Sequence, residues 1–173
     1  MKLYDLTIEY QENPIGLTVK RPRFSWKLDS DNENTFQNSY QIMITSDNNL
    51  IWDSQKVLSD QSVLVEYEGP TLQSEIQYHV QVTVTDNYEN VSTIEGHFLT
   101  GIFNPDDFTA KMITAEFNQK ETSPPIFYQR FKLKGSVKKA TIYATSYGIY
   151  ELNLNGNKIG KDYFTPGWTS YHH

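Results

Sequence analysis

The sequence contains no cysteine and no long hydrophobic run. Without cysteine, the chain has no disulfide to stabilise a small fold and no thiol for nucleophilic chemistry, which is typical of a reducing cytoplasm. No stretch reaches the roughly 18 consecutive apolar residues of a membrane-spanning helix. The N-terminal "MKLYDLTIEYQENP" has neither the apolar core nor the cleavage motif of a signal peptide. We therefore expect a cytoplasmic protein with no membrane partner.

Positive charge is scarce in the first part of the chain. Residues 1–101 contain 6 Lys and Arg against 15 Asp and Glu, a net charge of −9, whereas residues 102–173 have a net charge of +3. An acidic surface is a poor binder of nucleic-acid phosphates. In the second part Arg130, Lys132 and Lys134 alternate with apolar residues, which is typical of the solvated face of a strand. The charge pattern argues against a nucleic-acid partner and predicts two domains, 1–101 and 102–173.

The first part lacks any helical stripe and consists of short alternating segments. They are rich in β-branched and aromatic residues, and lie at residues 4–10, 22–28, 39–45, 50–54, 61–67, 74–86 and 92–100. Seven such segments in about a hundred residues predict a β-sandwich with essentially no α-helix. Alternation also predicts three inward-facing rows, formed by Phe24, Trp26 and Leu28, by Tyr40, Ile42 and Ile44, and by Tyr78, Val80, Val82 and Val84.

The second part also has the pattern of β-strands, after a junction around Gly101. We expect strands within residues 111–117, 126–133, 139–155 and 157–165. Asn155-Gly156 predicts a type I′ hairpin turn, because both residues tolerate positive φ, and Gly148 predicts a bulge or bend. A jelly roll has about eight strands. The chain therefore either ends partway through a jelly-roll-like sandwich or has an unusually small second domain.

The first part contains three motifs of one known fold. "RPRFSWKL", with Trp26, and "SYQIMI", with Tyr40, are similar to the B and C strands of a fibronectin type III domain. Leu72, six residues before Tyr78, resembles the tyrosine corner, in which the hydroxyl bonds to nearby backbone while the ring packs in the core. The resemblance implies a fibronectin type III or immunoglobulin-like sandwich.

The second part contains the longer motifs "GIYELNLNGNKIG" and "TPGWTSY". They are similar to the β-sandwich domain in the N-terminal region of bacterial α-L-rhamnosidases, which are family 78 glycoside hydrolases. "NPIGLTVKRPRFSWKLDSD" and "LIWDSQKVLSDQSVLVEYEGP" resemble the fibronectin-like module that precedes it in the same enzymes. Together these matches cover nearly the whole chain. The fold class that they imply is all-β, a first sandwich followed by a partial jelly-roll-like sandwich.

The resemblance implies that catalysis resides elsewhere. Enzymes of this kind place their acidic catalytic residues in a downstream (α/α) barrel, and no stretch here is similar to that barrel. Inverting hydrolysis needs two carboxyl groups about 6.5–9.5 Å apart, and no pair in this sequence matches them. The chain is expected to be an inactive accessory region of a rhamnoside-cleaving enzyme. The alternative is an independent carbohydrate-binding or adhesion module, and exposed sheet edges also predict self-association.

Aromatic residues near the C-terminus are the candidate contact residues. Trp168, Tyr163 and Tyr171 lie in or beside the Pro-Gly loop, where a flat ring can stack on a sugar or dock against a neighbouring domain. No catalytic residue, cofactor or metal ligand is predicted. The histidines are His79, His97 and the terminal pair His172-His173, which is native or part of a tag, and their spacing does not indicate a zinc site.

Overall fold

The computed structural model describes residues 1–116, 123–167 and 170 of this chain. Its backbone contacts divide the chain into two units, Met1–Thr109 and Ala110–His173, which are considered separately below. Unit 1 contains most of the regular structure. Within the described residues the helical structure is a single 3-10 turn, η1 (Pro105–Asp107), and no helix there is long and apolar enough to cross a membrane.

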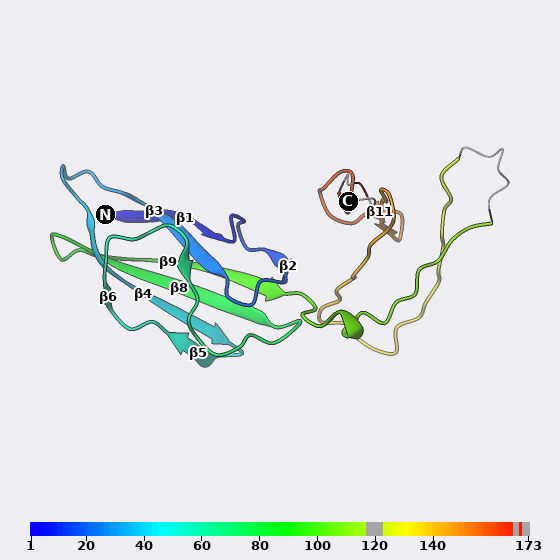
Figure 1. The fold of residues 1–173 in the computed structure, drawn as a ribbon, viewed down its shortest axis with the longest axis horizontal. Helices are drawn as coiled ribbons and strands as arrows, with labels where there is room; N and C mark the ends of the chain where they lie inside the picture. Colours follow the sequence, from blue (N-terminus) through cyan, green and yellow to red (C-terminus); the bar gives the residue numbers. More distant parts are fainter. Residues whose placement is uncertain (117–122, 168–169, 171–173) are drawn as a thin grey trace. The chain divides into compact units, whose positions relative to one another are not determined.

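The first unit is built from two β-sheets that form separate layers (Figure 1). The smaller sheet has the strand order β1-β3-β7, with β1 at Lys2–Ile8, β3 at Arg23–Asp29 and β7 at Val65–Glu66. The larger sheet has the order β2-β9-β8-β4-β5, and β6 also pairs with β4. Its strands are β2 (Ile15–Leu17), β4 (Gln37–Ser46), β5 (Asn49–Asp53), β6 (Val57–Leu58), β8 (Gln77–Asp86) and β9 (Val91–Thr100). The predicted all-β sandwich is confirmed.

The core lies between the two sheets and contains the predicted inward-facing rows. Phe24 and Trp26 of β3 are buried, and Leu28 is partly buried against them. The rows from β4 and β8 are fully inside, with Ile42, Ile44, Val80, Val82 and Val84 all buried. Because successive strand residues face opposite sides, period-2 alternation was sufficient to predict this core.

The predicted tyrosine corner is also present. Leu72 and Tyr78 are both buried, and the backbone N–H of Gln73 donates to the Tyr78 hydroxyl at 2.9 Å. The Tyr78 ring stacks on Phe98 of β9 with centroids 5.2 Å apart. One aromatic side chain therefore joins the loop before β8 to the sheet core.

Two strands of unit 1 lie outside the expected segments, and one segment forms less strand than predicted. β2 and β6 have three and two residues, too short for alternation to reveal. Within residues 61–67, Val65 and Glu66 form the strand β7. Leu64, immediately before it, has a φ of +53°, which interrupts extended pairing.

The second unit contains the predicted hairpin. β10 (Asn153–Leu154) pairs antiparallel with β11 (Asn157–Lys158). Between them Asn155 and Gly156 have φ values of +51° and +83°, as a type I′ turn requires. Gly148 lies in a bend with a φ of +91°, which confirms the irregularity predicted there.

Other strands predicted in the second unit are wrong for the described residues. Residues 126–133 and 139–149 have no strand assignment, and beyond the hairpin Tyr150 and Thr165 form an isolated antiparallel bridge. Their alternating apolar side chains are exposed, including Ile126, which is 94% exposed. Alternation shows that a segment can form a half-buried strand, but a strand also needs a partner to accept its backbone hydrogen bonds. Within the described part of unit 2, no strand pairing is assigned to these segments.

Candidate functional site

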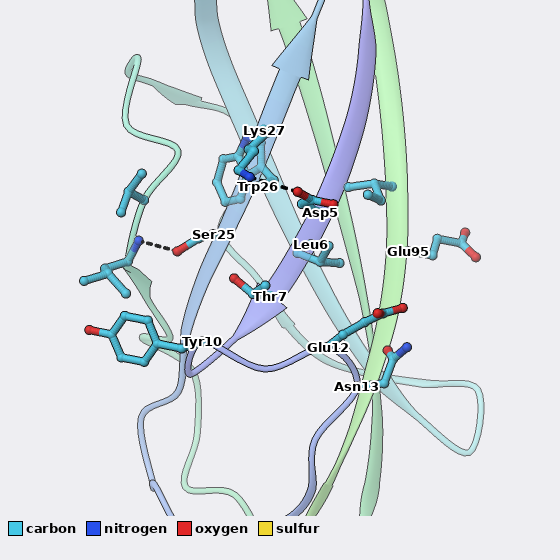
Figure 2. A pocket seen from close by; sticks show the side chains of 13 residues that line it. Asp5, Leu6, Thr7, Tyr10, Glu12, Asn13, Ser25, Trp26, Lys27 and Glu95 are labelled. Carbon is cyan, nitrogen blue, oxygen red and sulfur yellow. Dashed lines mark hydrogen bonds and ion pairs between the residues drawn. The ribbon is translucent and has the colours of Figure 1, made fainter. Parts of the chain in front are cut away.

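A surface hollow of about 520 Å³ in the first unit combines apolar, hydroxyl, amide and charged groups (Figure 2). It lies beside β1 and β3 and is called the β1–β3 hollow below. Its wall contains Asp5, Leu6, Thr7, Tyr10, Glu12, Asn13, Ser25, Trp26, Lys27, Val63, Leu64, Ile94 and Glu95.

A bulge in β1 shapes this hollow. Tyr4 pairs with Lys27 and Thr7 pairs with Ser25, so two residues, Asp5 and Leu6, face one residue of β3. Asp5 has a φ of +50°, the left-handed conformation found at one class of bulge. Such a bulge redirects side chains, and here Leu6 is buried while Asp5 remains on the outer surface.

Lys27 carries the positive charge in the β1–β3 hollow. Its Nζ donates to Asp5 Oδ2 at 2.9 Å and lies 5.8 Å from the centre of the Tyr4 ring. The hydrogen bond with Asp5 raises the pKa of Lys27. Both side chains are largely exposed, so the pair contributes little to the stability of the fold.

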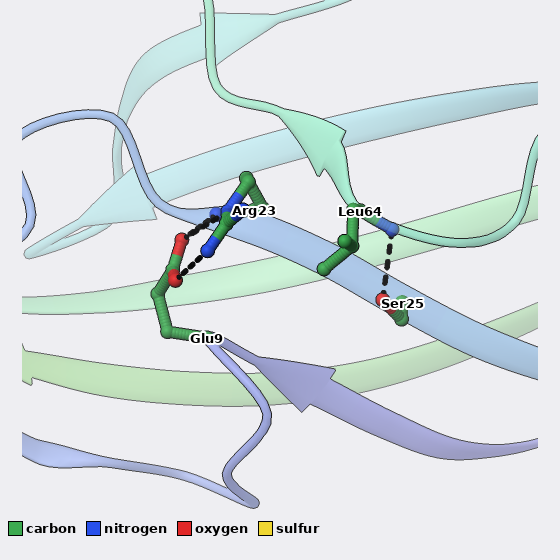
Figure 3. Close-up of polar contacts among 4 residues, drawn as sticks. All are labelled: Glu9, Arg23, Ser25 and Leu64. Carbon is green, nitrogen blue, oxygen red and sulfur yellow. Dashed lines mark hydrogen bonds and ion pairs between the residues drawn. The ribbon is translucent and has the colours of Figure 1, made fainter.

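A better-protected ion pair lies at the end of β1 (Figure 3). Arg23 Nε donates to Glu9 Oε1 at 2.9 Å, and Arg23 Nη2 donates to Oε2 at 2.6 Å. The backbone N–H of Arg23 also donates to Oε1 at 2.8 Å, and the Glu9 side chain is 11% exposed. The side-chain hydrogen bonds from Arg23 are the main reason why the pKa of Glu9 is lowered. This bidentate ion pair fixes the turn after β1, next to the β1–β3 hollow.

Stability should depend on pH through Glu9. Its pKa in the folded state lies below the ordinary value of 4.5, so its contribution is present above about pH 4.5 and is lost as pH falls through the lowered value. We expect Glu9→Gln to lower the guanidinium unfolding midpoint at about pH 7. At about pH 3 the midpoint of this variant should approach that of the parent protein. The exposed Glu12→Gln is the matched control and should be neutral at both values. Equal midpoints for Glu9→Gln and parent at neutral pH would contradict this role.

A second hollow of about 540 Å³ lies near β5 and β7. Trp52, Asp53, Glu66 and Glu68 are among its lining residues. The Trp52 ring meets the buried Tyr67 ring edge to face, with centroids 5.0 Å apart. Asp53 accepts a hydrogen bond from the Gln41 side chain at 2.8 Å. Its aromatic and carboxylate groups therefore contribute to internal packing as well as to the surface.

Tyr163 is the predicted contact residue that the structure describes. It is 79% exposed, and the Lys158 ammonium lies 3.8 Å from the centre of its ring. This cation–π contact links the strand β11 to the following loop. Trp168 and Tyr171 lie outside the described residues, so their proposed role as sugar or interface contacts stays a prediction.

The described titratable groups offer little for acid–base catalysis. Glu9 and Asp86 have shifted carboxyl pKa values, and both are lowered, whereas a general acid needs a raised value. Burial by itself raises the pKa of Asp86. Hydrogen bonds from Asn90 and from the Tyr88 backbone lower it by a larger amount, so the net shift of the pKa is downward. Among the residues described, no three His, Cys, Asp or Glu side chains gather as a metal site.

Sequence reasoning did not identify either hollow or the Glu9–Arg23 pair. The bulge that shapes the β1–β3 hollow depends on how β1 pairs with β3, and no motif in "YDLTIEY" signals it. Glu9 and Arg23 are 14 residues apart in the chain and meet through the same pairing. The signal that the sequence offered for these features was the presence of charged residues within the strand segments 4–10 and 22–28.

Two family models match the chain. Residues 3–104 match the family described as "Rha78A-like, N-terminal immunoglobulin domain", and residues 135–173 match "Alpha-L-rhamnosidase N-terminal domain". The two matches follow the order and most of the extent of the two resemblances seen in the sequence.

Curated relatives of this chain are named α-L-rhamnosidases. An α-L-rhamnosidase of Formosa agariphila is 30% identical over 92% of this chain and 19% of its own length. Another from Alteromonas sp. is also 30% identical, over 92% of this chain and 19% of its own length. This chain therefore spans about a fifth of the length of these relatives.

Solved structures support the same fold. The Streptomyces avermitilis α-L-rhamnosidase complexed with L-rhamnose matches with a TM-score of 0.61 and 32% identity, over 64% of this chain and 11% of that one. The native α-L-rhamnosidase of Aspergillus terreus matches 99% of this chain and 20% of its own, with a TM-score of 0.69. At 19% identity the second likeness concerns the fold alone.

Proposed function

Because this chain belongs to the family described as "Rha78A-like, N-terminal immunoglobulin domain", we propose that it is the non-catalytic N-terminal scaffold of an α-L-rhamnosidase. Such an enzyme releases terminal α-L-rhamnose from glycosides. The observation that carries the proposal is the succession of two matched N-terminal domains in a chain one fifth as long as its relatives. Location in a reducing cytoplasm stays a prediction from the absence of cysteine.

The partner that we propose is a catalytic (α/α) barrel domain downstream in the same polypeptide. The exposed apolar side chains of unit 2 support this proposal, since Ile126, Phe131 and Leu133 each leave well over half of their surface in contact with solvent. Exposed apolar surface of this kind is typical of an interaction site. In the longer protein, further segments of the chain would cover these residues and allow the predicted strands to pair.

The chain by itself is expected to hydrolyse nothing. Incubation with p-nitrophenyl α-L-rhamnoside should release no p-nitrophenol above a buffer blank, because the two carboxyl groups with shifted pKa values, Glu9 and Asp86, have lowered values, whereas a general acid needs a raised one. A purified rhamnosidase serves as the positive control. Turnover that co-purifies with this chain would overturn the scaffold proposal.

A carbohydrate-binding module is the second candidate, favoured by the exposed ring of Tyr163 and by the polar groups around Tyr10 in the β1–β3 hollow. Calorimetric titration with L-rhamnose and a rhamnoside separates the two functions. A scaffold gives no saturable heat. A module gives saturable heat that is lost in Trp168→Ala or Tyr163→Ala, or in Tyr10→Ala if the hollow is the site.

Self-association through sheet edges is a further proposal. The outer strands of the larger sheet, β2 and β5, can accept strands from another copy, and unit 2 adds exposed apolar side chains. Light scattering should then show a mass that rises with concentration. A constant monomer mass at high concentration would count against this association.

A further inference from the structure

The outer face of the larger sheet carries a histidine pair within a regular β-ladder. β8 and β9 pair without a shift from Gln77–Leu99 to Thr85–Val91, and within this ladder His79 lies directly opposite His97. Both residues are exposed, and their ring centroids are 6.2 Å apart. The two histidines are far apart in the sequence, so their spacing does not indicate this arrangement.

Neighbouring pairs on the same face show what distinguishes the histidines. In the next row Gln81 Nε2 donates to Glu95 Oε1 at 3.0 Å, and in the following row the Thr83 and Thr93 hydroxyls are 3.2 Å apart. In the His79–His97 row the imidazoles contact each other through their rings, and within the described residues the structure gives neither ring a hydrogen bond. Their nitrogens therefore remain available as ligands.

The separation of the rings suits one shared metal ion. With a metal–nitrogen bond of about 2.1 Å, two imidazoles on one tetrahedral ion have centroids about 5 Å apart. The observed 6.2 Å is longer by about 1 Å, a difference that small χ rotations of two exposed side chains can remove. The backbone needs no change, because the ladder fixes both Cα positions and Asn13 Oδ1 accepts from the His97 backbone N–H at 2.8 Å.

We infer that His79 and His97 form a two-histidine site for a late first-row divalent ion such as Zn²⁺. Imidazole nitrogen is a preferred ligand of Zn²⁺, Ni²⁺ and Cu²⁺, whereas Ca²⁺ and Mg²⁺ prefer oxygen. Two protein ligands leave the remaining positions to water or to a group from a partner. A bound ion joins β8 to β9 at a point where the structure provides no side-chain hydrogen bond.

The test is calorimetric titration of the 173-residue chain with Zn²⁺ alone. The variant His172→Ala/His173→Ala is the background, because it removes the other two histidines in the sequence. We expect one saturable ion per chain, and an affinity at least about tenfold weaker in His79→Ala and in His97→Ala, since each loses one of two ligands. Gln81→Ala, on the same strand face, is the matched control and should bind as the background does.

Two further measurements complete the test. His79→Gln and His97→Gln should reproduce the loss with a side chain close to histidine in size, and Zn²⁺ should raise the unfolding temperature of the background but not of these variants. Ca²⁺ should produce no saturable heat. Full Zn²⁺ affinity in either single-histidine variant, or no saturable binding in the background, overturns the proposal.

Discussion

Replacing Trp26 by alanine is expected to destabilise the first unit by about 3–5 kcal/mol, the range for removing a large aromatic side chain from a core. Trp26 is 1% exposed and lies between the two sheets. Its ring meets the buried Tyr40 edge to face, with centroids 5.5 Å apart. Strands from both layers surround the side chain, so the cavity left by alanine cannot close without moving a sheet.

Trp26 also carries a hydrogen bond that packing alone does not replace. Its indole Nε1 donates to Gln37 Oε1 at 2.9 Å, and Gln37 Nε2 donates to the carbonyls of Ser59 and Gln61 at 3.0 and 2.8 Å. Gln37 is itself buried. This chain of contacts fixes the segment between β6 and β7 against the core, because every polar atom in it has a partner.

The variant Trp26→Phe separates these two contributions. It retains most of the aromatic packing but leaves Gln37 Oε1 without its donor, so we expect a loss of about 1–3 kcal/mol. Guanidinium unfolding followed by circular dichroism measures both variants. Leu58→Ala, at a residue 77% exposed, is the control and should remain within about 0.5 kcal/mol of the parent. Losses for Trp26→Ala no greater than that control would show that the residue does not anchor the core.

Local patterns predicted the features of this fold that depend on strand periodicity. The inward positions of Trp26, Ile42 and Val82 follow from alternation, and the turn at Asn155-Gly156 follows from the φ values that those residues tolerate. Both are determined by neighbours in the sequence. The position of Gln37 as the partner of Trp26 depends on a contact between two strands, and no pattern in either strand specified it.

The candidate sites depend on how distant strands pair, so they were less predictable from the sequence than the core. The β1–β3 hollow exists because Asp5 and Leu6 together face one residue of β3, and the His79–His97 pair exists because of the register between β8 and β9. The exposed position of His79 follows from its strand face, but its partner follows from the register between the two strands. In unit 2, alternation overpredicted strands at 126–133 because strand formation also requires a paired neighbour.

Gly101 is another residue whose role depends on contacts between strands that are distant in the sequence. The sequence predicted a domain junction around Gly101, and the structure places Gly101 in a buried position immediately after β9. Its N–H donates to the Leu17 carbonyl at 2.7 Å, and its carbonyl accepts from the Glu75 N–H at 3.2 Å. The parallel pairing of the short strand β2 with β9 creates this environment. Glycine is required there because the two backbones approach each other closely.

Gly101→Ala is therefore expected to destabilise the first unit by about 1–3 kcal/mol, as overpacking does in other cores. A Cβ at this position would lie 2.7 Å from the Gly16 carbonyl oxygen, a backbone atom that cannot rotate away, so β2 must separate from β9. We expect a lower guanidinium midpoint and faster amide hydrogen exchange at Leu99, whose N–H donates to the Pro14 carbonyl beside β2.

Gly96→Ala, on the same strand, is the matched control for this prediction. Its Cβ would meet the Leu6 Cδ2 methyl group at 2.9 Å, which is the end of a flexible side chain. We expect a smaller loss, below about 1 kcal/mol, with unchanged exchange at Leu99. Equal effects from the two alanines would mean that the backbone contact between Gly101 and Gly16 does not hold β2 to the sheet. Faster exchange at Leu99 in Gly101→Ala alone would identify glycine as the residue that allows this parallel pairing.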